Sequence, residues 1–240
     1  MGRPRAALSF PLDIREHTDD KDLSMALTFY HGHGSPYSWR VWLALEFLGL
    51  PYEVRVLSFS EKDQLKPGFV AINPRHQVPT IVHDGFALWE SLAILEYLDE
   101  VAGGHRLFPG TAQERARLWR LAREDEEHLD RKGLTPVYEE LYLKPEGVPP
   151  DEARLEAGRK KLVEEMDCFG RELRGDFLAG KAPSAADFVL YPDIAYVKRI
   201  GAKKPQSGLE GILPAPIAQW AARIESLPYF EKTFPPHWRS

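Results

Sequence analysis

The pattern of hydrophobic and polar positions divides the chain into two parts. Up to about residue 101, short apolar or alternating runs typical of strands are interleaved with longer runs of helical periodicity. The runs that predict strands are residues 26–30, 51–57, 78–82 and 86–88, and those that predict helices are 39–50 and 91–101. Gly49 marks the end of the first helix, and Asp84-Gly85 predicts a hairpin turn. A helix between the first two strands predicts that they are parallel, so we expect a small mixed sheet with helices on its faces.

The rest of the chain has helical periodicity only. The predicted helices are residues 111–143, 151–174, 184–199 and 215–226. Residues 101–109 contain two adjacent glycines and a proline, which is typical of a domain boundary. We therefore predict a disordered leader at residues 1–24, an α/β domain at 25–106 and an all-helical domain at 111–240.

Composition and charge exclude several classes of protein. The formal net charge is −5, which is unfavourable for binding nucleic acid through its phosphates. No apolar run is long enough to predict a membrane span, and the leader lacks the apolar segment of a secretory signal. Cys168 is the only cysteine, so no intramolecular disulfide can form, and its apolar neighbours predict a buried core residue. These features favour a cytoplasmic location.

The first candidate functional motif is Ser35-Pro36-Tyr37-Ser38, at a predicted strand-to-helix junction. The positive end of a helix dipole favours an anion, and a hydroxyl there can donate to a thiolate and lower the pKa of that thiol. The alternative is that Ser35 only caps the helix, with Pro36 in its favoured first position.

Two further motifs lie later in the same α/β pattern. Gln77-Val78-Pro79 precedes a strand, and a cis bond at this proline would let the backbone of Val78 pair with an extended peptide ligand. Glu90-Ser91 begins a helix, where a hydroxyl and free N–H groups can bind a carboxylate and Glu90 can accept from an ammonium. Each motif also has an ordinary structural interpretation, as the start of a strand or a helix cap.

Together these segments resemble the soluble glutathione transferase superfamily. Residues 35–53, SPYSWRVWLALEFLGLPYE, resemble the active-site helix of its serine-type classes, particularly the tau-like and zeta-like proteins. Residues 72–98, INPRHQVPTIVHDGFALWESLAILEYL, resemble the NP-x-x-x-VP and E-S-x-A-I-x-x-Y-L signatures of the superfamily. The resemblance implies a thioredoxin-like N-terminal domain, an all-α C-terminal domain, glutathione as co-substrate, no metal and a homodimer.

The resemblance also implies roles for individual residues. Ser35 matches the catalytic serine that stabilises the glutathione thiolate, at a position where some relatives carry a reactive cysteine. The positions implied to bind glutathione are Gln77, Val78, Pro79, Glu90 and Ser91. Val78 precedes a cis-proline, Pro79, and its backbone pairs with the cysteinyl part, while Glu90 and Ser91 hold the γ-glutamyl end. Gln77 lies near the glycyl carboxylate, at a position that is often lysine in relatives. Lys66 is a further candidate for that carboxylate.

Other patterns have simpler interpretations. His31 and His33 lack a third metal ligand nearby in the sequence, so they are a weak metal signal and could line the substrate site instead. The acidic run at residues 124–127 is typical of a solvated helix face. Ser184 and Asp187 have the spacing of a reciprocal N-terminal helix cap. Tyr138, Tyr142 and Trp238 are candidates for the walls of an apolar substrate pocket.

The predicted function is conjugation of the glutathione thiolate to an electrophilic, hydrophobic substrate, as in detoxification. One alternative is a glutathione-dependent cis–trans isomerase of the zeta type, although zeta proteins usually have Ser-Ser-Cys and Gln-Ser where this chain has Ser35-Pro36-Tyr37 and Glu90-Ser91. A second alternative is a non-enzymatic binding module on the same fold, since a fold does not determine its function.

Overall fold

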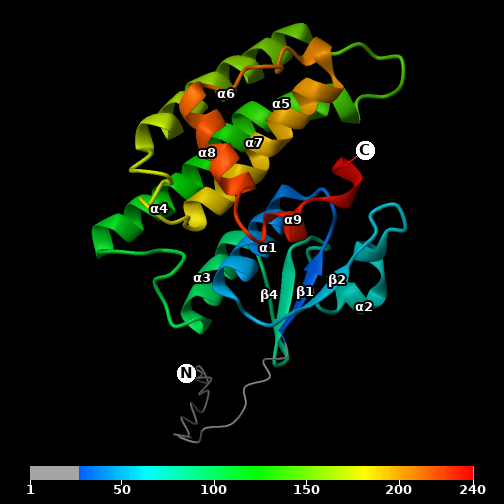
Figure 1. The fold of residues 1–240 in the computed structure, drawn as a ribbon. Helices are drawn as coiled ribbons and strands as arrows, with labels where there is room; N and C mark the ends of the chain where they lie inside the picture. Colours follow the sequence, from blue (N-terminus) through cyan, green and yellow to red (C-terminus); the bar gives the residue numbers. More distant parts are fainter. Residues whose placement is uncertain (1–26, 240) are drawn as a thin grey trace, which may run out of the picture.

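A four-stranded mixed sheet forms the centre of the N-terminal half of the computed structural model, which describes residues 27–239 (Figure 1). The predicted leader at residues 1–24 lies outside the described residues. The strands are β1 (Leu27–His31), β2 (Glu53–Val56), β3 (Thr80–His83) and β4 (Phe86–Trp89), in the spatial order β2-β1-β3-β4. β1 is parallel to β2 and antiparallel to β3, which forms a hairpin with β4.

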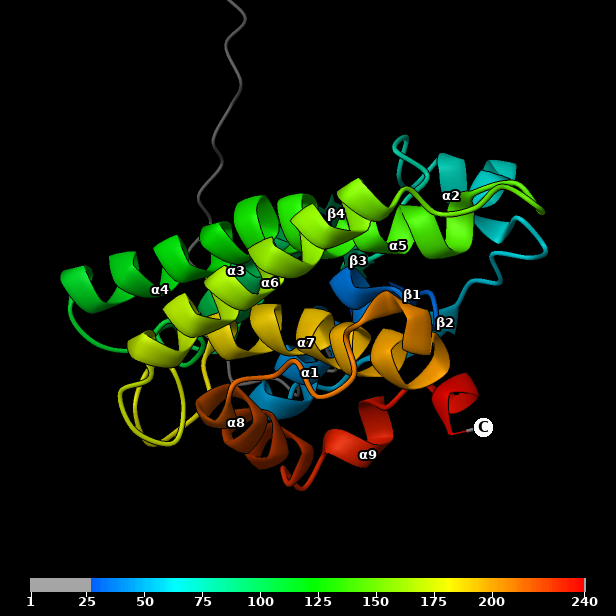
Figure 2. The same ribbon diagram turned by 90° about the horizontal axis from the view of Figure 1, so that it is seen from above.

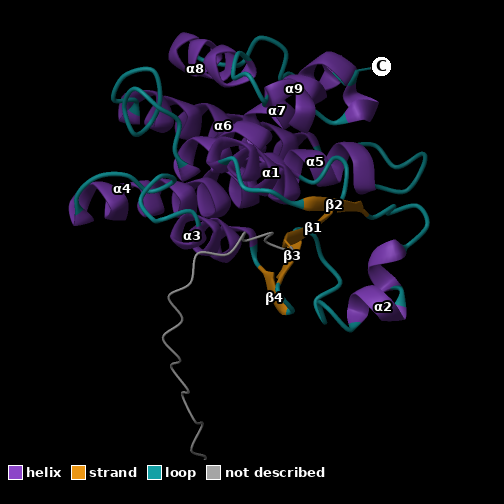
Figure 3. Ribbon diagram, turned by 60° about the horizontal axis from the view of Figure 1, so that its bottom comes forward, coloured by secondary structure: helices purple, strands orange, loops and turns teal. Residues whose placement is uncertain are grey.

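Three helices accompany the sheet. α1 (Pro36–Leu48) and α3 (Ser91–Val101) pack against each other on one side, and α2 (Pro67–Val70) lies on the other (Figures 1 and 3). α1 ends where Gly49 adopts a left-handed conformation at φ 69° and donates its N–H to the carbonyl of Leu45. The predicted thioredoxin-like arrangement of the first half is confirmed.

The described residues of the second half form helices and connecting loops, with no strand. Its principal helices are α4 (Ala112–Glu124), α5 (Thr135–Tyr138), α6 (Glu152–Glu172), α7 (Ala185–Lys203), α8 (Ala215–Glu225) and α9 (Phe230–Thr233). π-helical stretches at Asp125–Leu134 and Glu139–Leu143 flank α5. π-Helical stretches are rare in proteins, and those that occur are often located at functional sites. Figure 2 shows α6, α7 and α8 side by side. The exact boundary between the halves, at residues 106–111, stays a prediction.

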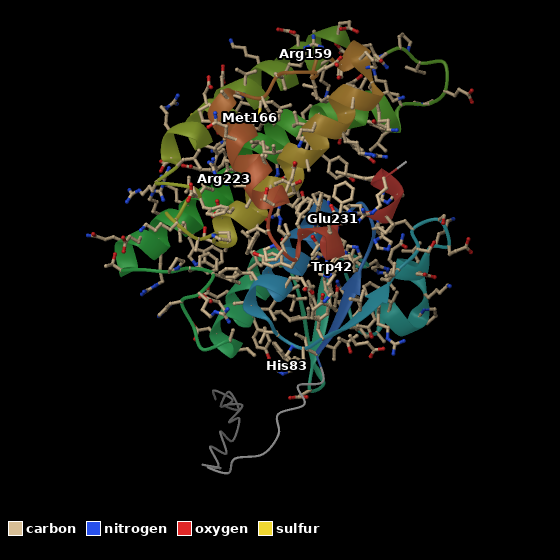
Figure 4. The ribbon with its side chains drawn as sticks, in the orientation of Figure 1. Trp42, His83, Arg159, Met166, Arg223 and Glu231 are labelled. Carbon is tan, nitrogen blue, oxygen red and sulfur yellow. The ribbon has the colours of Figure 1, made fainter. Side chains whose placement is uncertain are left out.

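The two halves share one hydrophobic core, because α1 packs directly against α7. The rings of Phe47 and Phe188 lie 5.5 Å apart, and those of Trp39 and Tyr191 lie 5.4 Å apart. In Figure 4, Trp42 lies over the sheet while Met166 lies among the helices. α1 is therefore a structural element of both halves.

α7 begins with the reciprocal cap that the sequence predicts. The Asp187 carboxylate accepts from the backbone N–H of Ser184 at 2.8 Å and from its hydroxyl at 2.7 Å. It also accepts from the N–H of Leu178 at 2.9 Å and from the indole of Trp220 at 2.8 Å. The cap thus connects three separate segments of the helical half.

Cys168 is exposed, so the prediction of a buried core cysteine is wrong. α6 buries Leu162, Met166 and Phe169, which recur at helical spacing on one face. Residue 168 follows Met166 by two positions and therefore points away from that face, where the Arg171 guanidinium lies 3.1 Å from its sulfur. Among residues 27–239, no helix is long and apolar enough to cross a membrane.

Candidate active site

A cavity of about 510 Å³ lies where the sheet meets the helical half, at the end of the β3–β4 hairpin where Thr80 pairs with Trp89, opposite to the end at His83. Its walls come from the start of α1, the connection between β2 and β3, the start of α3 and the α4 region. The lining residues are Ser35, Tyr37, Phe59, Gln64, Asn73, His76, Gln77, Val78, Pro79, Trp89, Glu90, Ser91, Arg123, Glu126 and Arg131. Ser35 and the five positions implied to bind glutathione are all among them.

Ser35 is the N-terminal cap of α1. Its hydroxyl oxygen accepts from the backbone N–H of Ser38 at 3.2 Å, and Pro36 occupies the first helical position. A hydroxyl that accepts from the helix keeps its own hydrogen available to donate. The capping role and a role in binding an anion are therefore compatible.

The Val78–Pro79 peptide bond is cis, as the motif required. Asn73 supports this turn by donating its side-chain amide to the carbonyl of Gln77 and to the hydroxyl of Thr80, both at 2.9 Å. Within the described residues, neither the N–H nor the carbonyl of Val78 has a hydrogen-bond partner. Both groups therefore remain available to pair with an extended peptide ligand.

Glu90 and Ser91 form the junction between β4 and α3. Glu90 has the unusual backbone angles φ 70° and ψ 109°, a conformation that L-residues rarely adopt and that recurs at functional sites. Ser91 is the first residue of α3 and is 6 % exposed. The first N–H groups of a helix have no carbonyl partner within it, so this end can accept a carboxylate.

A buried ionic group, which we call the Arg40 cluster, lies beneath this junction and consists of Arg40, Asp125, Glu126 and Asp193. The Arg40 guanidinium lies 2.9 Å from Glu126, 3.5 Å from Asp193 and 3.6 Å from Asp125. It also lies 3.5 Å from the hydroxyl of Ser91. Burial, followed by the negative charge of Asp193, raises the pKa of Asp125. Burial, followed by the negative charge of Asp130, raises the pKa of Asp193 to about 7.

Tyr37 lines both this cavity and a second one of about 220 Å³. The second cavity is lined by Gly34, Pro36, Tyr37, Asp130, Leu134, Thr135, Tyr138 and Tyr196. The Tyr37 hydroxyl donates to Asp130, which also accepts from Thr135 at 2.8 Å. Burial, reinforced by Asp130, raises the pKa of Tyr37, so this phenol stays protonated. The walls of this second cavity are largely apolar.

Family models match both halves of the chain. The model of the glutathione S-transferase N-terminal domain matches residues 34–101, and the model of its C-terminal domain matches residues 152–230. The chain belongs to the glutathione S-transferase family. Members of this family use glutathione as co-substrate, and the matched N-terminal region contains all six candidate residues.

Curated relatives and solved structures agree with this assignment to the glutathione S-transferases. Glutathione S-transferase A of Pleuronectes platessa is 28 % identical over 88 % of this chain and 92 % of its own length. Maleylacetoacetate isomerase of Rattus norvegicus is 31 % identical over 69 % of this chain and 75 % of its own length. The crystal structure of a glutathione S-transferase from the Antarctic clam Laternula elliptica is 27 % identical, covers 90 % of this chain and 94 % of its own, and has a TM-score of 0.72.

Several lining residues of this glutathione transferase escape sequence reasoning. Gln64 lies in a polar stretch without periodicity, and Arg123 and Arg131 lie in a predicted helical run that is rich in charged residues. Asn73 belongs to the quoted NP-x-x-x-VP signature, which could have indicated its supporting role. Lys66, the candidate for the glycyl carboxylate, does not line the cavity: its ammonium pairs with Asp63 at 2.5 Å.

The acidic run at residues 124–127 is not a uniformly solvated face, contrary to the prediction. Asp125 is fully buried, and Glu126 pairs with Arg40 at 2.9 Å. The π-helical stretch that begins at Asp125 turns these side chains toward α1.

The histidine pair also lies outside both cavity linings. The rings of His31 and His33 are joined at 3.1 Å between Nε2 and Nδ1, and burial, followed by the nearby His33, lowers the pKa of His31 to about 3. Residues 27–239 contain no group of three or more histidine, cysteine or acidic side chains placed to hold a metal.

Proposed function

We propose that this protein conjugates the thiolate of glutathione to an electrophilic, hydrophobic substrate. The observation that carries the proposal is the convergence, in one cavity, of a helix-capping hydroxyl, an unpaired backbone segment before a cis-proline and a second helix start. These three features match the thiol, the central peptide and the amino-acid end of glutathione.

In this proposal each part of glutathione has a defined partner. Ser91 and the free N–H groups of α3 bind the α-carboxylate of the γ-glutamyl residue, and Glu90 accepts from its ammonium. The N–H and carbonyl of Val78 pair with the cysteinyl residue. Ser35 then donates its hydroxyl hydrogen to the sulfur, at the positive end of the α1 dipole.

The reaction follows from this placement. The thiol releases its proton to solvent, because the hydroxyl and the helix dipole stabilise the thiolate. The sulfur attacks an electrophilic carbon of a substrate in the second cavity, so that a carbon–sulfur bond forms and the leaving group departs with the electron pair of its former bond. Apolar walls near Tyr138 position that substrate.

The first experiment replaces Ser35 by alanine. We expect kcat/KM with a dinitrophenyl halide to fall by a factor of about 100 to 1,000, the range for losing one donor to a developing anion. The pKa of the enzyme-bound thiol, followed by thiolate absorbance in the ultraviolet, should rise at the same time. The variant also loses a helix cap, so its thermal unfolding is measured in parallel.

Tyr37→Phe and Ser38→Ala are matched controls because each removes a neighbouring hydroxyl. The hydroxyl of Tyr37 is already bound to Asp130, and the side chain of Ser38 is fully buried. Both variants should keep the wild-type thiol pKa. If Ser35→Ala keeps it while one of the controls does not, the assignment of Ser35 is wrong.

A glutathione-dependent cis–trans isomerase is the second candidate, favoured by the 31 % identity to maleylacetoacetate isomerase of Rattus norvegicus. Turnover of maleylacetoacetate is compared with conjugation of a panel of electrophiles. Isomerisation that exceeds conjugation in kcat/KM would replace the present proposal. If titration calorimetry detects no binding of glutathione, a non-enzymatic binding module is the better interpretation.

The proposal includes a homodimer in the cytoplasm. Membership of the glutathione S-transferase family, in which homodimers are typical, supports this mode of assembly. A single free cysteine is compatible with a reducing compartment. Light scattering at micromolar concentration tests the assembly, and fractionation of the native source tests the location.

A further inference from the structure

A tight turn precedes Ser35 and leads the chain from β1 into α1. The N–H of Ser35 donates to the carbonyl of Gly32 at 3.1 Å, and Gly34 has φ 86°. This is the pattern of a type II turn, in which the third residue has a positive φ and is usually glycine. Because glycine has more conformational freedom than any other residue, the neighbours of this turn decide how firmly it is held.

One of these neighbours is Tyr196 of α7, which belongs to the helical half. Its hydroxyl donates a hydrogen bond to the carbonyl of Gly34. Burial raises the pKa of Tyr196, so the phenol keeps the proton that it donates. The Tyr196 ring is supported in turn by the indole of Trp238, in an edge-on contact with ring centres 4.8 Å apart.

The turn is closely enclosed on this side. A Cβ at Gly34 would lie 3.2 Å from ring atoms of His237 and 3.5 Å from the hydroxyl oxygen of Tyr196. The first of these distances is shorter than most contacts of a Cβ atom. Both α7 and the C-terminal segment therefore limit the movement of the turn.

Hydrogen bonds hold both peptide groups that flank Ser35. The carbonyl of Ser35 accepts from the N–H of Trp39 at 3.0 Å, within the first turn of α1. In the preceding peptide group, the N–H is bound to Gly32 and the carbonyl is bound to Tyr196. Because each peptide group is planar, fixing both of them fixes the direction in which the Ser35 side chain leaves the backbone.

We propose that Tyr196 is a positioning residue for the activation of the thiol: it holds the carbonyl of Gly34 and thereby directs the Ser35 hydroxyl toward the sulfur of glutathione. The inference rests on the proposed function, because it requires Ser35 to donate to the thiolate. It gives the helical half a part in activating glutathione, in addition to its part in forming the second cavity.

The test is Tyr196→Phe, which keeps the ring and removes the donor. We expect the pKa of the thiol in the complex with glutathione alone, followed by thiolate absorbance in the ultraviolet, to rise by about 0.5 to 1 unit, as for the loss of one hydrogen bond. Since the thiolate is the reactive form, kcat/KM at a pH below that pKa should fall by about three- to tenfold. The deficit should disappear at about pH 9.5, where the thiol is ionised in both proteins.

Tyr191→Phe is the matched control, because it removes a phenol hydroxyl from the same helix. The hydroxyl of Tyr191 donates to Glu225 at 3.1 Å, and the residue is 1 % exposed. This variant should lower the thermal midpoint but keep the wild-type thiol pKa and kcat/KM. If Tyr196 only stabilised α7, its variant would behave in the same way as Tyr191→Phe.

A double-mutant cycle tests whether Tyr196 acts through Ser35. In the Ser35→Ala background, Tyr196→Phe should leave the thiol pKa at the value that Ser35→Ala sets, because the hydroxyl to be positioned is already absent. Additive shifts of the thiol pKa would show that Tyr196 acts on the sulfur independently of Ser35, and would overturn the inference.

The outcomes separate this inference from the proposed function. If Ser35→Ala raises the thiol pKa and Tyr196→Phe does not, the inference is wrong and the transferase proposal stands. A higher KM for the electrophile, with an unchanged thiol pKa, would assign the Tyr196 hydroxyl to the second substrate instead. If Ser35→Ala itself keeps the wild-type thiol pKa, the proposed role of Ser35 is wrong, and the positioning role of Tyr196 is wrong with it.

Discussion

Asp193 is a buried carboxyl whose ionisation makes stability depend on pH below neutrality. It is fully buried, and burial together with Asp130 raises its pKa to about 7, compared with about 3.9 in an unfolded chain. Between these two values the folded protein holds a proton that the unfolded chain has released. The contribution of Asp193 to stability therefore falls as pH rises from about 4 to 7.

Asp193→Asn should reduce this dependence, because asparagine keeps the shape of the neutral acid but does not titrate. We expect the free energy of unfolding to fall less for the variant than for the wild type between about pH 4 and 8, with a difference of up to about 4 kcal/mol. Urea unfolding across this range measures it. Asp167→Asn, at an exposed position, is the control. Parallel pH profiles for Asp193→Asn and the wild type would contradict the expectation.

At this scale the sequence reveals residues whose role is local. Ser35 and Ser91 begin helices, and Val78 precedes a proline, so their neighbours in sequence define their backbone geometry. Gln64 and Asp125 have no such local marker, because only the packing of distant segments determines which way their side chains point. The positions of Ser35, Val78 and Ser91 in one cavity could be predicted, and the Arg40 cluster could not.

Helix α7 illustrates how one cap can stabilise an element. Asp187→Ala leaves several buried donors without an acceptor, including the Trp220 indole and the Leu178 N–H. We expect a loss of about 3 kcal/mol or more, compared with about 1 kcal/mol for Ser184→Ala, which removes a capping hydroxyl. Chemical denaturation of both variants measures the difference.

Helix α4 supplies the control because it has the same type of cap on the surface. The Thr111 hydroxyl accepts from the N–H of Glu114 at 3.3 Å in an exposed setting. Thr111→Ala should cost about 1 kcal/mol or less. A cost for Asp187→Ala no greater than that of Thr111→Ala would show that the additional bonds of Asp187 contribute little.

The same cap shows where prediction of elements from sequence ends. The spacing of Ser184 and Asp187 is local and predicts the start of α7. The indole of Trp220, 33 positions further along, approaches Asp187 only because α8 packs there. The spacing of apolar residues does not predict the π-helical stretch at Asp125–Leu134, because the same spacing also fits an ordinary α-helix.

For the whole molecule, the shared core predicts a single unfolding transition. α1 contacts both the sheet and α7, so neither half can lose its packing without exposing the other. The six tryptophans are divided between the halves, with Trp42 in the first and Trp220 in the second. Thermal unfolding followed by near-ultraviolet circular dichroism should give one midpoint that agrees with the calorimetric midpoint. Two separate calorimetric peaks would contradict the expectation.

The Arg40 cluster limits how the two halves could be exchanged between relatives. Arg40 belongs to the thioredoxin-like half, and its three carboxylate partners belong to the helical half. A chimera that combines this first half with a foreign helical half lacking these acids would leave a guanidinium buried without a counter-ion, which typically costs about 3–5 kcal/mol. The reciprocal chimera, with a foreign first half that lacks Arg40, would leave Asp125, Glu126 and Asp193 without their cation. A half can therefore be exchanged only if the residues at positions 40, 125, 126 and 193 still match. Recombination within the family has to preserve a charge pattern that neither half carries alone.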